Sequence, residues 1–366
     1  MRITRTVRPL PLLLAVATSA SFTALPAQEP LGGGTFINRV LVENTFVGWT
    51  SPAAYPPLVN FGAGALTGFV VNNCGNLAPG MQVACTAPAG TTAGRVLLSA
   101  AVWNPADGCP DCPVTTIDME LDHRDGVTVA PGQLVWPAIV QGAVMYVGPS
   151  AAALSNVWAK INWNALTAAQ FCAVTGANAL GLITACGTNP SFACTAAPLS
   201  FGFVVTVSSA VPTTRTHCYD NFRVVLNCPA QFTTFCAGCA NCGVFPPAIG
   251  FTGGLPTIGN LLFTITETGA CANVPTFLIL GMSNTTCSCG PLPLNLTFLG
   301  FPLCNLCVSP DIIAATMTTA FGAASIPVGI PDDVYLIGAK FYAQWLDFGP
   351  PAIGMSNAAE ILIGSP

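Results

Sequence analysis

Six of the 15 acidic residues in this 366-residue chain lie between positions 107 and 125. Three of them, Asp118, Glu120 and Asp122, occupy alternate positions. Side chains two positions apart in a strand share one face at intervals of about 7 Å. The spacing therefore predicts a strand with an acidic face, and it predicts that the apolar residues of the same strand point into the core: Ile117, Met119 and Leu121.

Such a face has a simple interpretation and a chemical one. The simple interpretation is a solvated strand surface. The chemical one is calcium binding, because calcium takes six to eight oxygen ligands from carboxylates and backbone carbonyls. The acids that could contribute to this site are Asp107, Asp111, Asp122 and Asp125. Their spacing differs from that of an EF-hand loop.

Aromatic residues in the first half of the chain could bind sugars. The apolar face of a pyranose stacks on an exposed ring, and nearby polar side chains hydrogen-bond its hydroxyl groups. The alternative is that these rings pack in the core, as we expect for Trp49 and Trp345 beside their strands. The candidates for sugar contact are Trp136, Tyr146, Trp158, Asn162 and Trp163.

Acid–base and nucleophilic groups are scarce. Only 7% of the residues are charged, and His123 and His217 are the two histidines. No Gly-x-Ser-x-Gly nucleophile elbow occurs in the sequence. We therefore expect a protein that is not an enzyme.

Cysteine is abundant, with 17 residues. In an oxidising compartment these would form up to eight disulfides and leave one thiol over or joined to a partner. Metal-like pairs also occur, since Cys236 and Cys239, and likewise Cys304 and Cys307, are each separated by two residues. Disulfides are the prediction and a zinc site is the alternative.

The N-terminus predicts export. Arg2, Arg5 and Arg8 precede an apolar run and small residues, which is the pattern of a secretory signal over residues 1–27, with cleavage after Ala20 as an alternative. We expect a secreted or cell-surface protein. Without the signal, seven basic and 15 acidic residues give a net charge of about −8, which argues against a nucleic-acid partner.

Short apolar runs alternate with turns along the mature chain, which has no long helical period. The mean hydropathy is +0.63, but 36 Gly and 32 Pro keep apolar runs below the 18 residues of a membrane-spanning helix. The pattern predicts an all-β protein of two β-sandwich domains, with one helical turn over residues 165–171 capped by Asn164. The predicted boundaries are 35–228 for a jelly roll, 229–242 for a cysteine-rich joint and 243–366 for a smaller, immunoglobulin-like sandwich.

Two segments resemble known families. Residues 40–50 and 219–224 are similar to the first and last strands of jelly rolls of the carbohydrate-binding-module, or galactose-binding-like, type. This resemblance implies a structural calcium held by Asp220 and Glu43; the alternative is that Asp220 caps a turn and Asn221 fills a tight conformation. Residues 243–366 resemble a C-terminal β domain of secreted planctomycete proteins, through Leu255–Asn260 and Phe341–Trp345. Neither resemblance carries a known activity over to this chain.

A third resemblance concerns the acidic strand. Its alternation is similar to the active strand of retaining glycosidases of the laminarinase type, in which one carboxylate attacks and another protonates. Here aspartates stand at two positions where that family has glutamates. The sequence thus leaves three functions open. The first is a secreted, non-catalytic structural or surface-interaction protein; the second is a carbohydrate-binding module with structural calcium that contacts glycans or cell-surface components; the third is a glycosidase.

Overall fold

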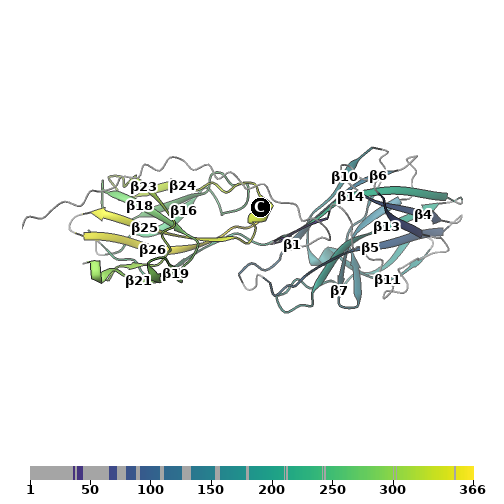
Figure 1. The fold of residues 1–366 in the computed structure, drawn as a ribbon, viewed down its shortest axis with the longest axis horizontal. Helices are drawn as coiled ribbons and strands as arrows, with labels where there is room; N and C mark the ends of the chain where they lie inside the picture. Colours follow the sequence, from purple (N-terminus) through teal and green to yellow (C-terminus); the bar gives the residue numbers. More distant parts are fainter. Residues whose placement is uncertain are drawn as a thin grey trace, which may run out of the picture.

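The computed structural model is all-β, as predicted, and its described residues include three short 3-10 turns among the strands. It forms two lobes that lie end to end, with the C-terminus at their junction (Figure 1). No helix in the described part of the chain is long and apolar enough to cross a membrane. The structure describes residues 36–37, 39–43, 66–71, 80–87, 91–107, 111–125, 133–152, 157–178, 181–209, 211, 213–240, 242, 245–299, 301, 303–349 and 352–366.

The N-terminal domain packs two antiparallel sheets face to face. Sheet 1 contains β1 (Phe36–Ile37), β2 (Val40–Glu43), β3 (Leu66–Val71), β4 (Gly80–Ala87), β6 (Thr116–Asp125), β10 (Ala159–Leu166) and β14 (Thr213–Asn227). Sheet 2 contains β5 (Thr91–Trp103), β7 (Gln133–Gln141), β8 (Val144–Val147), β9 (Ala151–Ala152), β11 (Cys172–Asn178), β12 (Gly181–Ala185) and β13 (Leu199–Ser209). Strand β14 is central, because β6 pairs along one side of it while β2 and β4 pair along the other.

Alternating side chains explain the core of this domain. Ile117, Met119 and Leu121 of β6 are fully buried and pack with Phe203 of β13 and Phe222 of β14. The predicted orientation of the β6 residues is therefore confirmed. The acids between them point to the opposite face of sheet 1.

The C-terminal domain is a smaller sandwich. Sheet 3 has the strand order β15 (Gln231–Phe235), β26 (Ala352–Leu362), β25 (Lys340–Gly349), β18 (Pro275–Gly281) and β23 (Ile312–Met317). Sheet 4 has the order β16 (Ala248–Thr252), β17 (Thr264–Thr268) and β24 (Ala324–Pro327). Trp345 of β25 is fully buried between them, as predicted. Two short hairpins complete the domain: β19 (Thr286–Cys287) with β20 (Gly290–Pro291), and β21 (Leu294–Asn295) with β22 (Asn305–Leu306).

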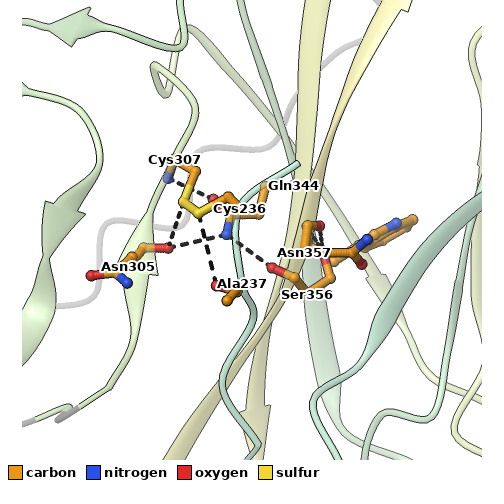
Figure 2. The surroundings of a disulfide bond; sticks show 8 residues. Cys236, Ala237, Asn305, Cys307, Gln344, Ser356 and Asn357 are labelled. Atoms are coloured by element: carbon orange, nitrogen blue, oxygen red, sulfur yellow. Dashed lines mark hydrogen bonds between the residues drawn. A yellow bond between two sulfur atoms is a disulfide. The ribbon is translucent and has the colours of Figure 1, made fainter. Parts of the chain in front are cut away.

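Disulfides hold the cysteine-rich segment 229–242 to the C-terminal domain. Cys236 pairs with Cys307, and Cys239 pairs with Cys304. Figure 2 shows the first of these beside Gln344, whose side-chain oxygen accepts a hydrogen bond from the Cys307 backbone N–H at 2.9 Å. The other bridges within the described residues are Cys112–Cys228, Cys172–Cys186, Cys242–Cys271 and Cys287–Cys289.

The predicted joint is more than a linker. Its residues 231–235 form β15, which pairs with β26 as an edge strand of sheet 3. The C-terminal end of the chain returns to the same place, where the Ser365 backbone N–H donates to the Cys228 carbonyl at 3.0 Å. The segment therefore belongs to the C-terminal sandwich.

The two lobes share an apolar contact. Val40, Val225 and the Cys112–Cys228 bridge of the N-terminal domain pack in one cluster with Ile337 of the C-terminal domain. Beside it, Lys340 pairs with Asp111 of the N-terminal domain at 2.7 Å and with Glu360 of its own domain at 2.9 Å. Burial of apolar surface and this charge network together tie the lobes to each other.

Two local predictions need comment. The predicted helical turn over 165–171 is a 3-10 turn, η1 (Ala168–Gln170), and its N-cap is Thr167. The prediction of Asn164 as the cap is wrong, because β10 extends through Leu166 and the chain turns only after it. The other 3-10 turns are η2 (Leu296–Leu299) and η3 (Val334–Leu336). The predicted signal and Trp49 lie outside the described residues.

Candidate functional site

The outward side of β6, β10 and β14 carries a continuous set of polar side chains. The cross-strand register places Asn162 of β10 and Arg223 of β14 on either side of Glu120 of β6. One step along, Lys160 lies opposite Asp122. We call this surface the polar face, and it comprises Asp118, Glu120, Asp122, Lys160, Asn162 and Arg223.

Glu120 is the centre of the polar face and is held by two cations. Its Oε1 lies 2.9 Å from Arg223 Nε and 3.2 Å from Lys160 Nζ. All three side chains are partly exposed, so the pairs are screened by solvent and each contributes little to stability. The two ion pairs instead fix the position of the Glu120 carboxylate between strands β10 and β14.

Asp118 is held by neutral donors. Its Oδ1 accepts a hydrogen bond from the Ala165 backbone N–H at 2.5 Å, and its Oδ2 accepts one from Asn227 Nδ2 at 2.9 Å. These bonds connect β6 to the ends of β10 and β14. Beside Asp118 the face is hollowed, and the hollow is lined by Asp118, Met119, Glu120, Asn164, Arg223 and Val225.

Trp158 lies at the other end of the polar face. It immediately precedes β10, whose first residue, Ala159, pairs with His123. The Arg124 guanidinium lies 5.2 Å from the centroid of the Trp158 ring, within the range of a cation–π contact. The ring is half-buried and its position is therefore fixed while part of its surface remains open.

Asp220 of β14 pairs with Asp122 of β6 at the edge of a bulge in β14. The register between β14 and β6 shifts between Asp220 and Arg223, and Asn221 adopts a positive φ of 49°. The Asn221 backbone N–H donates to Asp220 Oδ1, and Asn221 Nδ2 donates to Asp122 Oδ2, both at 2.8 Å. Asn221 therefore occupies a left-handed conformation, as the alternative to a calcium site predicts for this residue.

The calcium candidates fall into two places. Asp122 and Asp220 are both buried and are register partners, and the backbone of Glu43 pairs with Phe222 on the other side of β14. Asp111 instead contacts Lys340, while Asp107 is exposed in the turn after β5. Asp125 ends β6, and its side chain, like that of Glu43, lies outside the described residues. Among described side chains no group of three or more metal-type ligands occurs.

Of the residues predicted to contact sugar, some lie in the core and others lie at the surface. Tyr146 and Trp163 are only 7% and 5% exposed and pack in the core, where Trp163 Nε1 donates to the Pro149 carbonyl at 2.9 Å. Their predicted role as sugar platforms is therefore corrected, because the inward faces of β8 and β10 carry them. Trp136 is half-buried on sheet 2, with Nε1 3.4 Å from Thr206 Oγ1. Of the five candidates, the structure brings Trp158 and Asn162 to the polar face.

Both histidines lie inside the N-terminal domain. His123 and His217 are buried, and the His217 ring centroid lies 6.3 Å from that of Tyr219. They belong to the interior and not to the polar face. The residues that the sequence prediction missed are Lys160 and Arg223; Lys160 shares the alternation of Asn162 along β10, which is the signal that could have found it.

The C-terminal sandwich contains a separate pair of buried acids. Glu267 of β17 and Asp347 of β25 are both fully buried between sheets 3 and 4, and Thr276 Oγ1 donates to Glu267 Oε2 at 3.0 Å. Burial raises the pKa of Glu267 to about 9, and the neighbouring Asp347 carboxylate adds to the rise. Burial also raises the pKa of Asp347. The pair therefore holds a proton at neutral pH.

No family model matches the chain, and no curated protein matches it. Among solved structures, the family 11 carbohydrate-binding module of a cellulosomal cellulase of Clostridium thermocellum is 12% identical over 54% of this chain and 96% of that chain, with a TM-score of 0.29. A Shewanella oneidensis protein of unknown function is 12% identical over 51% and 86%, with a TM-score of 0.28. A β-1,2-glucanase of Parabacteroides distasonis is 9% identical over 90% and 39%, with a TM-score of 0.26.

These likenesses are weak. They include jelly-roll carbohydrate-binding modules, but at identities and TM-scores too low to assign a family. The resemblance of residues 243–366 to a planctomycete C-terminal domain stays a prediction.

Proposed function

We propose that this protein is an exported, non-catalytic binding protein whose polar face holds a glycan. The observation that carries the proposal is the fixed ring of Trp158 at one end of a surface on which Asn162, Lys160 and Arg223 converge around Glu120. Sugars need such a combination, because their C–H faces stack on aromatic rings and their hydroxyl groups pair with amides and charged side chains.

The same contacts argue against glycosidase chemistry at this strand. A retaining glycosidase needs one carboxylic acid that donates a proton and one carboxylate free to attack. Glu120 is paired with two cations, and each oxygen of Asp118 accepts a hydrogen bond. Neither side chain is free to act as a proton donor or as a nucleophile in this arrangement.

Export is supported by the sulfur chemistry. Six disulfides join cysteines within the described residues, and such bonds persist in oxidising compartments. We include a secreted or cell-surface location in the proposal, with a structural calcium held by Asp220 and Glu43 as its cofactor.

A glycan array probed with the purified protein tests the proposal. We expect binding that is reduced at least about tenfold by Trp158→Ala or Asn162→Ala, the loss that corresponds to 1.4 kcal/mol. Trp136→Ala is the matched control, because Trp136 is also a half-buried tryptophan but lies on sheet 2. Equal loss in the control variant, or full binding by Trp158→Ala, would refute the placement of the site.

The second candidate is a structural surface protein without a glycan ligand. The observation that favours it is the tied junction, in which Lys340 connects Asp111 to Glu360 beside a shared apolar cluster. Such a junction holds two domains at a fixed separation, as a spacer requires. An array with no signal for any glycan would favour this candidate, and hydrolysis of a β-glucan that is abolished by Glu120→Gln would instead favour a glycosidase.

A further inference from the structure

The hairpin of β19 and β20 is closed by a disulfide between Cys287 and Cys289, which are separated by Ser288 alone. Cys289 is exposed to solvent, and Cys287 is partly exposed. An external thiol can therefore reach this bond without any opening of the sandwich.

This bond does little for the stability of the fold. A disulfide stabilises a protein mainly by restricting the unfolded chain, and the restriction grows with the length of the loop that it closes. Cys287–Cys289 spans two positions, whereas Cys112–Cys228 spans 116 and Cys239–Cys304 spans 65. The hairpin is also closed independently by the pairing of Thr286 with Pro291.

We propose that Cys287–Cys289 is a thiol–disulfide exchange site for external thiols. In the first step an external thiolate attacks Sγ of Cys289; the bond between the two protein sulfurs breaks, a mixed disulfide forms at Cys289, and Cys287 leaves as a thiolate that takes a proton from water. A second external thiolate then attacks the external sulfur of the mixed disulfide, which releases an oxidised external disulfide and the Cys289 thiolate. Two external thiols are oxidised, and the protein disulfide gains two electrons and two protons.

The local structure suits the reduced state as well as the oxidised one. Cys287 Sγ lies 3.3 Å from the Gly290 carbonyl oxygen, so the thiol formed by reduction has an acceptor in place. The segment 283–299 carries no charged residue of its own. Exposure of the bond and its short span are the causes of the exchange.

Partial reduction of the full chain tests this site. The oxidised protein is exposed to reduced glutathione, samples are quenched with iodoacetamide over time, and alkylated peptides are quantified. We expect Cys287 and Cys289 to be alkylated at least about tenfold faster than Cys172 and Cys186. The second pair is the matched control, since Cys186 is also exposed but the bond spans 14 positions. Equal or faster alkylation of the control pair would overturn the proposal.

A double variant, Cys287→Ser with Cys289→Ser, separates exchange from stability. We expect it to lower the melting temperature less than the loss of Cys172–Cys186 does, because the loop that Cys287–Cys289 closes is shorter, and to lose the rapid phase of glutathione oxidation. A fall in melting temperature as large as that caused by removing Cys172–Cys186 would assign a structural role to the bond and would also overturn the proposal.

Discussion

The buried pair of Glu267 and Asp347 makes the sharpest prediction about pH. The pKa of Glu267 is raised from 4.5 to about 9 by burial, so the folded protein binds a proton that the unfolded chain releases above pH 4.5. A group that binds more protons in the folded state stabilises it less as the pH rises. Stability should therefore fall between about pH 5 and pH 9.

The size of this loss follows from the same shift. One pH unit in this window costs about 1.4 kcal/mol, so a rise from pH 5 to pH 8 costs up to roughly 4 kcal/mol. Glu267→Gln removes the titrating proton and keeps a side chain of similar shape beside Thr276. Asp347, whose pKa is also raised, contributes to the slope of parent and variant alike, so we expect the variant to be more stable than the parent by up to roughly 4 kcal/mol at pH 8 and nearly equal to it at pH 5.

Urea unfolding of parent and variant between pH 5 and pH 8 measures this difference. Glu360→Gln is the control, because Glu360 is partly exposed and pairs with Lys340; we expect it to leave the pH slope unchanged. A flat pH profile of the parent would refute the reasoning. So would a Glu267→Gln variant that is less stable than the parent at pH 8, since that result would mean that a bound cation and not a proton neutralises the pair.

Other parts of the structure give further expected outcomes. Asn221→Ala should destabilise the N-terminal domain by about 1–2 kcal/mol in thermal melts because of its positive φ, whereas Asn221→Gly should cost less; equal losses would contradict the strain argument. Replacing Cys112 and Cys228 by serine should cost about 4–5 kcal/mol, because the bond closes a loop spanning 116 positions, and a loss below 1 kcal/mol would contradict that role. Lys340→Met should change stability by less than about 1 kcal/mol and speed limited proteolysis near the junction; unchanged proteolysis would count against the charge network. If Asp220 and its neighbours hold calcium, EDTA should lower the melting temperature and added calcium restore it, and the absence of a shift would remove calcium from the proposal.

Alternation along single strands could be predicted from the sequence. The inward set of β6 was predicted correctly because a period of two is a local property of the chain. The partners of Glu120 could not be found in this way, because the register that brings Arg223 beside it depends on a bulge at Asn221 in a strand about one hundred positions away. Local pattern fixes which face a residue occupies, but pairing between distant strands decides what it touches.

The predicted sugar-contact residues show the same limit of prediction from local sequence. Trp163 and Asn162 are adjacent in β10, and only the direction of the strand face separates a core residue from a surface residue. The ion pair between Asp111 and Lys340 depends on how two domains meet, for which neither residue carries a local signal. Domain contacts of this kind need the three-dimensional structure.

The structure of the polar face depends on a disulfide bond. Cys112 precedes β6 and Cys228 follows β14, so their bond clamps the two central strands of the face at one end, where Thr116 pairs with Asn227. The same chemistry attaches residues 236–239 to the C-terminal domain through two bridges. A protein whose cysteines were reduced would lose both constraints.

Intact mass of freshly purified protein, measured in denaturing buffer without reductant and after treatment with iodoacetamide, tests this dependence most directly. The account predicts at most one alkylated thiol, a mass lower by about 2 Da for each disulfide formed, and no zinc bound to cysteine in a parallel native measurement. Alkylation of most cysteines, with zinc bound in the native measurement by Cys236, Cys239, Cys304 and Cys307, would contradict it.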